Sequence, residues 1–136
     1  MIVDTSALVA ILTGEPQADL LLAAAAGAPR LRISAATALE ASVVLDNRSV
    51  PQQRHRLDDL LATLQVEIVP FDADQWRVAR EAYRDFGKGS GHGAQLNLGD
   101  CFSYALHRTT GEPLLFVGDD FAAAGIERVR LESPAD

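Results

Sequence analysis

The sequence predicts an α/β domain in which a mostly parallel sheet of four to five strands lies between layers of helices. Short apolar runs alternate with longer helical patterns along the chain, an order that is typical of parallel strands joined by crossover helices. The 136 residues fit one compact domain, so we expect residues 1–136 to form a single unit. Hydrophobic residues make up 48% of the chain, which is enough to build a core between the layers.

Capping residues and helix breakers delimit the elements of the first half. Ser6 is a good N-cap residue for a first helix, which Gly14 ends, and Ser34 can cap a later helix in the same way. Pro16 and Pro51 suit the first turns of two further helices. The expected strands cover residues 1–3 and 31–33, and the expected helices cover residues 6–13, 16–26, 35–47 and 51–64.

The same signals delimit the second half. Pro70 ends a third strand, the glycine-rich loop 87–93 follows a long helix, and Asn97 caps the next helix. The expected strands cover residues 66–69, 114–117 and 129–131, and the expected helices cover residues 73–86, 97–109 and 121–124. Because parallel sheets bind ligands at the carboxyl ends of their strands, functional residues are expected at that edge.

Composition excludes several classes of protein. A net charge of −7 argues against a protein that coats nucleic acid through bulk positive charge. The longest apolar run, Leu20–Ala26, is far shorter than the roughly 20 residues of a membrane span. Asp4 comes too early for a secretion signal, so we expect a soluble, cytoplasmic protein. Cys101 is the only cysteine, which excludes an internal disulfide.

A few acidic residues occupy positions where a carboxylate requires an explanation. Asp4 follows the first predicted strand, and Asp119 and Asp120 follow the fourth. Glu40 lies on an apolar stripe in the middle of a helix, a setting that disfavours a bare charge. Asp100 lies at the start of another helix. We therefore expect acids from four separate stretches to meet at one edge of the sheet.

Each acid also has an interpretation without an active site. Asp4 can help to cap the first helix, and Asp100 has the spacing of a capping box. The pair Asp119–Asp120 can form a simple turn, and Glu40 can reach solvent if its helix is less buried than expected. Only their convergence on one edge argues against these interpretations.

Crowded carboxylates raise one another's pKa values unless a cation neutralises them. All-oxygen ligands select hard cations, so Mg²⁺ is expected, with Mn²⁺ as a possible substitute. The histidines His55, His92 and His107 lack the paired spacing of a zinc site. A hard cation can polarise a phosphodiester and lower the pKa of bound water. The pattern thus indicates metal-assisted phosphodiester hydrolysis, without specifying the substrate.

Four segments together resemble the PIN-domain ribonucleases, and among them the VapC toxins of bacterial VapBC toxin–antitoxin pairs. They cover essentially the whole chain in the family's order, and together are far more specific than any one of them. The resemblance implies the PIN-like three-layer α/β/α fold. The segments are residues 1–8, 34–40, 96–102 and 114–121.

The resemblance also implies roles for the acids. Asp4, Glu40 and Asp100 would be the central acids around Mg²⁺, with Asp4 and Asp100 as direct ligands. Asp119 is the expected fourth catalytic acid, and Asp120 is the reserve, because family members vary within this turn. Whether one or two metal ions bind is left open.

The implied activity is that of a toxic endoribonuclease. It would cleave structured RNA such as tRNA or rRNA, inhibit translation, form a homodimer and be neutralised by a cognate VapB antitoxin. Ser6 would supply a hydroxyl that orients Asp4 or a metal-bound water.

A row of basic residues is a further candidate for contact with RNA. Steps of three, four and four residues put them along one face of the predicted helix 73–86 and its end. Glu81 and Asp85 lie among them, so a solvated, salt-bridged helix face is the simpler interpretation. The row consists of Arg77, Arg80, Arg84 and Lys88.

Two other functions are alternatives to the endoribonuclease. A receiver-like phosphoacceptor module would need an acidic pair after the first strand and a lysine after a late strand. The chain has the single acid Asp4 there, and its only lysine, Lys88, lies in the glycine-rich loop. An inactive PIN-fold interaction module is the second alternative, but none of the family's acids is missing.

Overall fold

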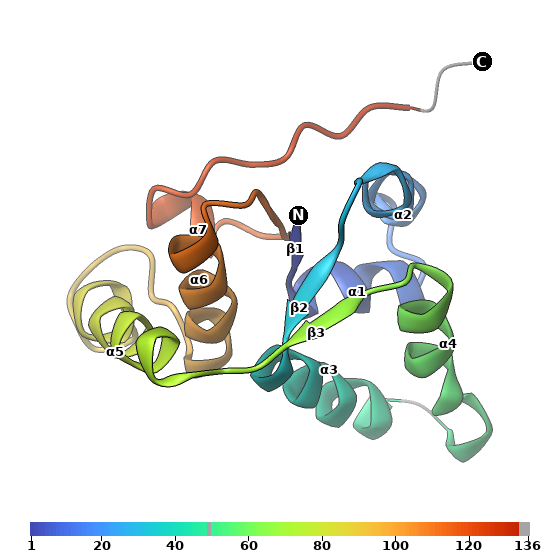
Figure 1. Cartoon of the computed structure of the whole chain (residues 1–136), viewed down its shortest axis with the longest axis horizontal. Coiled ribbons are helices and arrows are strands. Elements are labelled where there is room, and N and C mark those ends of the chain that lie inside the picture. Colours follow the sequence, from blue (N-terminus) through green and yellow to red (C-terminus); the bar gives the residue numbers. More distant parts are fainter. Residues whose placement is uncertain (49, 134–136) are drawn as a thin grey trace.

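A sheet of four parallel strands forms the centre of the molecule (Figure 1). The computed structural model describes residues 1–48 and 50–133. Strand order is β3-β2-β1-β4, so β1 is central and has β2 on one side and β4 on the other. The bounds are Ile2–Val3 for β1, Arg32–Ser34 for β2, Glu67–Val69 for β3 and Leu114–Leu115 for β4.

Seven α-helices occur in the described part of the chain, and they cover both faces of this sheet (Figure 1). A short 3-10 helix, η1, precedes the fourth. The bounds are Thr5–Leu12 for α1, Ala18–Gly27 for α2, Ala35–Arg48 for α3, Pro51–Gln53 for η1, His55–Thr63 for α4, Ala73–Phe86 for α5, Leu98–Thr110 for α6 and Asp120–Ala123 for α7.

Two apolar clusters, one on each face of the sheet, make the three layers. Successive side chains of a strand point to opposite faces. Val3 and Leu115 accordingly pack with residues of α1, α2, α3 and α4. Their neighbours Ile2 and Leu114 pack with residues of α5, α6 and α7. The predicted α/β class, with a parallel sheet between helical layers, is thus confirmed.

Two predicted elements differ from the structure. The helix expected over residues 51–64 is divided into η1 and α4. The fifth strand expected over residues 129–131 is wrong, because this segment is irregular. Val129 and Leu131 pack against the cluster that contains Val3, so their apolar character reflects side-chain packing rather than backbone pairing.

Three strands have their carboxyl ends at the edge of the sheet where the acids are found. Asp4 connects β1 to α1, β2 runs straight into α3, and residues 116–119 connect β4 to α7. β1 lies beside both β2 and β4, so these three carboxyl ends are neighbours. In the described residues, no helix has both the length and the apolar character needed to cross a membrane.

Leu8→Ala should destabilise the fold by about 2–5 kcal/mol, because Leu8 is fully buried among apolar side chains. Leu39→Ala is a matched control, since Leu39 is 67% exposed, and its effect should stay within about 0.5 kcal/mol. Urea unfolding measures both free energies. Equal losses in the two variants would contradict the assignment of this core.

Candidate active site

Asp4 is the most deeply buried acid of the site, with 2% of its surface exposed. Its Oδ2 accepts hydrogen bonds from the Ser6 backbone N–H (3.0 Å) and the Ser6 hydroxyl (2.7 Å). Its Oδ1 accepts a third from the Ser103 hydroxyl (2.6 Å). Asp4 is therefore the N-cap of α1, as one interpretation of the sequence held, and it also faces α6.

Hydroxyl groups extend this network to other strands and helices. The Ser6 hydroxyl accepts a hydrogen bond from the backbone N–H of Val117 (3.0 Å), just beyond β4. The hydroxyls of Ser103 and Thr37 share a hydrogen bond of 3.2 Å, which links α6 to α3. The carboxylate of Asp4 is thus connected to the ends of β1 and β4 and to three helices, α1, α3 and α6.

Glu40 projects from α3 toward the start of α6. Its Oε1 accepts a hydrogen bond from the Thr5 hydroxyl (2.5 Å). Burial raises the pKa of Glu40, the Thr5 hydrogen bond lowers it, and the nearby charge of Asp4 raises it further, with a net rise. A Cβ added at Gly99 would overlap the Glu40 carboxylate, so this approach depends on the glycine.

Asp100 combines a capping role with a place among the acids. Its Oδ2 accepts from the Asn97 backbone N–H (3.0 Å), and its own N–H donates to Asn97 Oδ1 (2.8 Å), which completes a capping box. The pKa of Asp100 is raised to about 6, mainly by burial. The Asn97 hydrogen bond lowers this pKa, and the charges of Asp4, Asp120 and Glu40 raise it.

The three central acids line one cavity of about 340 Å³ at the carboxyl edge of the sheet. It lies where β1 has β2 on one side and β4 on the other, the switch point at which open α/β sheets bind ligands. Asp4, Glu40 and Asp100, which are 36 and 60 residues apart in sequence, are thus brought together. The remaining lining residues are Thr5, Ser6, Val9, Glu15, Val44, Arg48, Asn97 and Val117.

Neither candidate for the fourth acid, Asp119 or Asp120, lines this cavity. The side chain of Asp119 is 99% exposed, forms an ion pair of 2.7 Å with Arg128 and does not line the cavity. Asp120 is the first residue of α7, and its charge contributes to the raised pKa of Asp100. Asp120 is exposed as well, but of the two only Asp120 contributes its charge to the raised pKa of Asp100, which favours the reserve.

The predicted basic row on α5 is largely neutralised by acids of the same helix. Arg77 pairs with Asp74 (3.0 Å) and Arg84 pairs with Asp85 (3.1 Å). The Arg80 guanidinium lies 5.9 Å from the centre of the Trp76 ring. The solvated, salt-bridged interpretation therefore fits Arg77 and Arg84, while Lys88 is exposed in the loop after α5.

Comparison with known proteins decides the family. The PIN domain model matches residues 1–127. A VapC ribonuclease of Mycobacterium bovis is 50% identical over 126 residues, which cover 93% of this chain and 96% of the relative. Ribonuclease VapC of Mycolicibacterium smegmatis is 48% identical over 129 residues, or 95% of this chain and 99% of the relative. The chain belongs to the PIN-domain VapC ribonucleases.

Solved structures of VapC and toxin–antitoxin proteins have the same fold at low sequence identity. VapC20 of Mycobacterium tuberculosis, described as a sarcin-ricin loop cleaving toxin, superposes with a TM-score of 0.74 at 22% identity. The match covers 95% of this chain and 98% of VapC20. A toxin–antitoxin complex from Klebsiella pneumoniae gives a TM-score of 0.67 at 22% identity, with 89% of each chain covered. Family membership excludes the receiver-like alternative.

The acids of this VapC chain have the donor chemistry of a hard cation. Within residues 1–48 and 50–133, no three acidic, histidine or cysteine side chains converge tightly enough to hold an ion alone. Mg²⁺ usually keeps several waters and takes one or two carboxylates from the protein. Asp4 and Asp100 line an open cavity and fit that mode of binding. An ionised carboxylate has about four acceptor positions, so the three hydrogen bonds to Asp4 leave a position for a metal ion.

Of the residues that hold the acids in place, the sequence indicates Ser6, which binds Asp4, but Ser103 and Thr5 were missed. Ser103 lies three residues after Asp100 on α6, a spacing that puts both on one helix face and could have indicated it. Thr5 follows Asp4 directly, but its bond to Glu40 joins positions 35 residues apart, and no sequence signal indicates that pairing.

Asp100→Asn should stabilise the metal-free protein by about 1–2 kcal/mol near neutral pH, a range reduced for partial solvent exposure. The pKa of Asp100 is higher in the folded chain, so the folded state binds more protons between pH 3.8 and about 6. Wild-type stability therefore falls as pH rises through this window, and Asn removes that loss while keeping an acceptor for the Asn97 N–H.

Urea unfolding in EDTA at about pH 7 and about pH 4 tests this linkage. The advantage of Asp100→Asn should disappear at the lower pH. Asp119→Asn is the control, because that carboxylate is 99% exposed and should show little pH-dependent change. An advantage of the same size at both pH values would contradict the electrostatic origin.

Proposed function

We propose that this VapC-family protein is a toxic, Mg²⁺-dependent endoribonuclease that cleaves structured RNA, tRNA or rRNA, and so inhibits translation. The observation that carries the proposal is the single cavity lined by Asp4, Glu40 and Asp100. VapC ribonucleases related over nearly the whole chain support the activity. The description of VapC20 as cleaving the sarcin-ricin loop supports structured RNA as the substrate class.

In the proposed site, Asp4 and Asp100 hold the Mg²⁺ ion, and Mn²⁺ can replace it. When bound, the ion polarises the phosphodiester and lowers the pKa of a bound water. Ser6 and Ser103 fix the orientation of Asp4 through its two oxygens. Asp120, rather than Asp119, supplies the fourth carboxylate.

Glu40 is the proposed proton acceptor for the attacking water. A raised pKa makes a carboxylate a better base, because the ideal pKa of a catalytic base lies near the working pH. Thr5 holds one oxygen of Glu40, and Gly99 provides the space into which the carboxylate extends. These contacts fix the base relative to Asp4 and Asp100.

The partners follow from the same family. We propose that the protein acts in the cytoplasm as a homodimer and is neutralised by a cognate VapB antitoxin. The toxin–antitoxin complex from Klebsiella pneumoniae, which has the same fold, supports a protein inhibitor as partner.

Glu40→Gln should reduce RNA cleavage by about 100- to 10,000-fold, because a general base contributes on that order. Asp4→Asn should be comparably inactive, whereas Asp119→Asn, at an exposed ion pair, should keep wild-type activity. Cleavage of total RNA by antitoxin-free protein, with Mg²⁺ and with EDTA, measures each rate. Folded Glu40→Gln and Asp4→Asn proteins that cut at the wild-type rate would refute the site, and an inactive wild type would favour the interaction module.

Gly99→Ala should lower kcat by about 10- to 100-fold, because the new methyl group displaces the Glu40 carboxylate from its position. Stability should be kept or should rise by up to about 1 kcal/mol, since alanine favours a helix over glycine. Gly27→Ala is the matched control: Gly27 ends α2 and has open space where a Cβ would lie. Unchanged kcat in Gly99→Ala would show that the position of Glu40 does not matter.

A further inference from the structure

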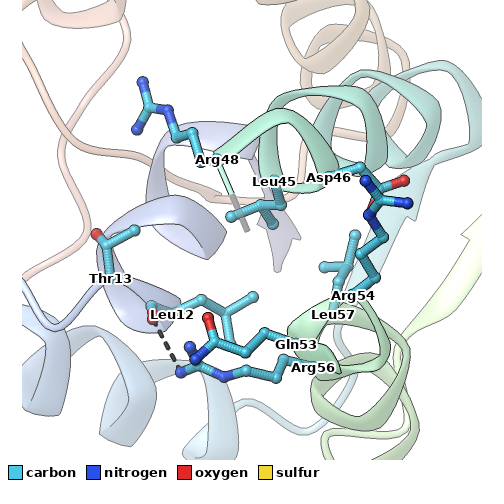
Figure 2. A pocket seen from close by; sticks show the side chains of 9 residues that line it. All are labelled: Leu12, Thr13, Leu45, Asp46, Arg48, Gln53, Arg54, Arg56 and Leu57. Atoms are coloured by element: carbon cyan, nitrogen blue, oxygen red, sulfur yellow. Dashed lines mark hydrogen bonds between the residues drawn. The ribbon is translucent and has the colours of Figure 1, made fainter. Parts of the chain in front are cut away.

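A second cavity, of about 260 Å³, lies beside the active site, and three arginines are among the residues that line it (Figure 2). It lies between the end of α1, the end of α3 and the start of α4, where Leu45 and Leu57 form part of its wall. Arg48, the last residue of α3, lines both this cavity and the one that contains the central acids. The two cavities are therefore neighbours that share the side chain of Arg48.

Three exposed arginines line this cavity in a chain whose net charge is −7. Across the described part of the chain, neither Arg48, Arg54 nor Arg56 belongs to an ion pair. The Arg56 guanidinium donates to the backbone carbonyl of Leu12 (2.9 Å), as Figure 2 shows. Asp46 is the one acid of the lining, so the cavity keeps a positive balance.

The contrast with α5 identifies which basic residues are available to a ligand. Arg77 and Arg84 are neutralised by Asp74 and Asp85 of their own helix, and α5 contributes no side chain to the active-site cavity. Among the described residues, the arginines around the second cavity form no ion pair, and Arg48 also lines the cavity of the central acids. A polyanion bound at an acidic site needs nearby cations for its flanking phosphates.

We propose that Arg48, Arg54 and Arg56 form a phosphate-binding surface that holds the RNA backbone next to the bond that is cut. The proposal rests on the proposed function and adds the place where the substrate's flanking phosphates bind. A guanidinium group can donate two parallel hydrogen bonds to a phosphate, which suits a backbone of regularly spaced anions. RNA is favoured over an acidic protein segment because Arg48 adjoins the cavity in which a phosphodiester would react.

The test compares two double variants with the same change in charge. Arg48→Gln/Arg54→Gln removes unpaired arginines of the cavity, and Arg77→Gln/Arg84→Gln removes the neutralised ones on α5. Arg56 is left in place because it holds the end of α1. Fluorescein-labelled oligouridylate and polyglutamate are titrated in EDTA over a range of salt concentrations, and thermal unfolding checks that each variant is folded.

For oligouridylate, the slope of log binding constant against log salt should fall by about 0.7 for each lost cavity arginine. The α5 variant should bind as wild type does. In cleavage assays with Mg²⁺, the cavity variant should show a raised KM and a nearly unchanged kcat, since its arginines bind flanking phosphates rather than the reacting group. That combination supports the proposal.

Three results would overturn the proposal: an unchanged salt slope in the cavity variant, an equal loss in the α5 variant, or a loss confined to polyglutamate, which would indicate an acidic protein partner. These results would not contradict the proposed nuclease activity, because RNA cleavage by the wild-type protein is measured separately. Conversely, a wild type that binds oligouridylate through these arginines but cuts no RNA would refute the proposed function and keep the phosphate-binding surface.

Discussion

The buried carboxylate of Asp4 is the group on which the assembly of this site depends. An ionised carboxylate with 2% of its surface exposed is costly unless hydrogen bonds replace its water. Ser6 and Ser103 supply three of them, and Ser6 also binds the backbone beyond β4. The need to satisfy one charge therefore fixes the start of α1, the face of α6 and the end of β4 relative to one another.

The position of the surrounding acids reduces the stability of the folded chain. Burial raises the pKa of both Glu40 and Asp100, and each is raised further by the charge of Asp4. Gly99 adds to this expense, since a helix gains stability from almost any other residue except proline. Such a local loss of stability is expected at positions where the residue serves function rather than folding.

Much of the fold could be predicted from local signals. Proline, glycine and capping residues delimit the helices closely, and α5 was predicted at its observed bounds, Ala73–Phe86. The segment 129–131 was misassigned because alternating apolar residues indicate which side chains are buried, not whether the backbone finds a strand partner. Periodicity alone cannot separate these two causes.

The candidate site was predictable only where position or family pattern marks a residue. Asp4, Glu40 and Asp100 were predicted to meet, and they line one cavity. Ser103 was missed because its role comes from a contact with Asp4, 99 residues away. The basic row on α5 was visible in the sequence, but its neutralisation depends on side-chain geometry.

The hydrogen bonds around Asp4 have a consequence for the timing of activity during synthesis. Ser103 and Val117 are translated 99 and 111 residues after the residues they contact. A nascent chain that ends before α6 carries Asp4, Ser6 and Glu40 but has neither Asp100 nor the Ser103 hydroxyl that binds the second oxygen of Asp4. The cavity and its hydrogen bonds therefore cannot be complete until α6 and the segment after β4 have been synthesised, which means nearly the whole polypeptide.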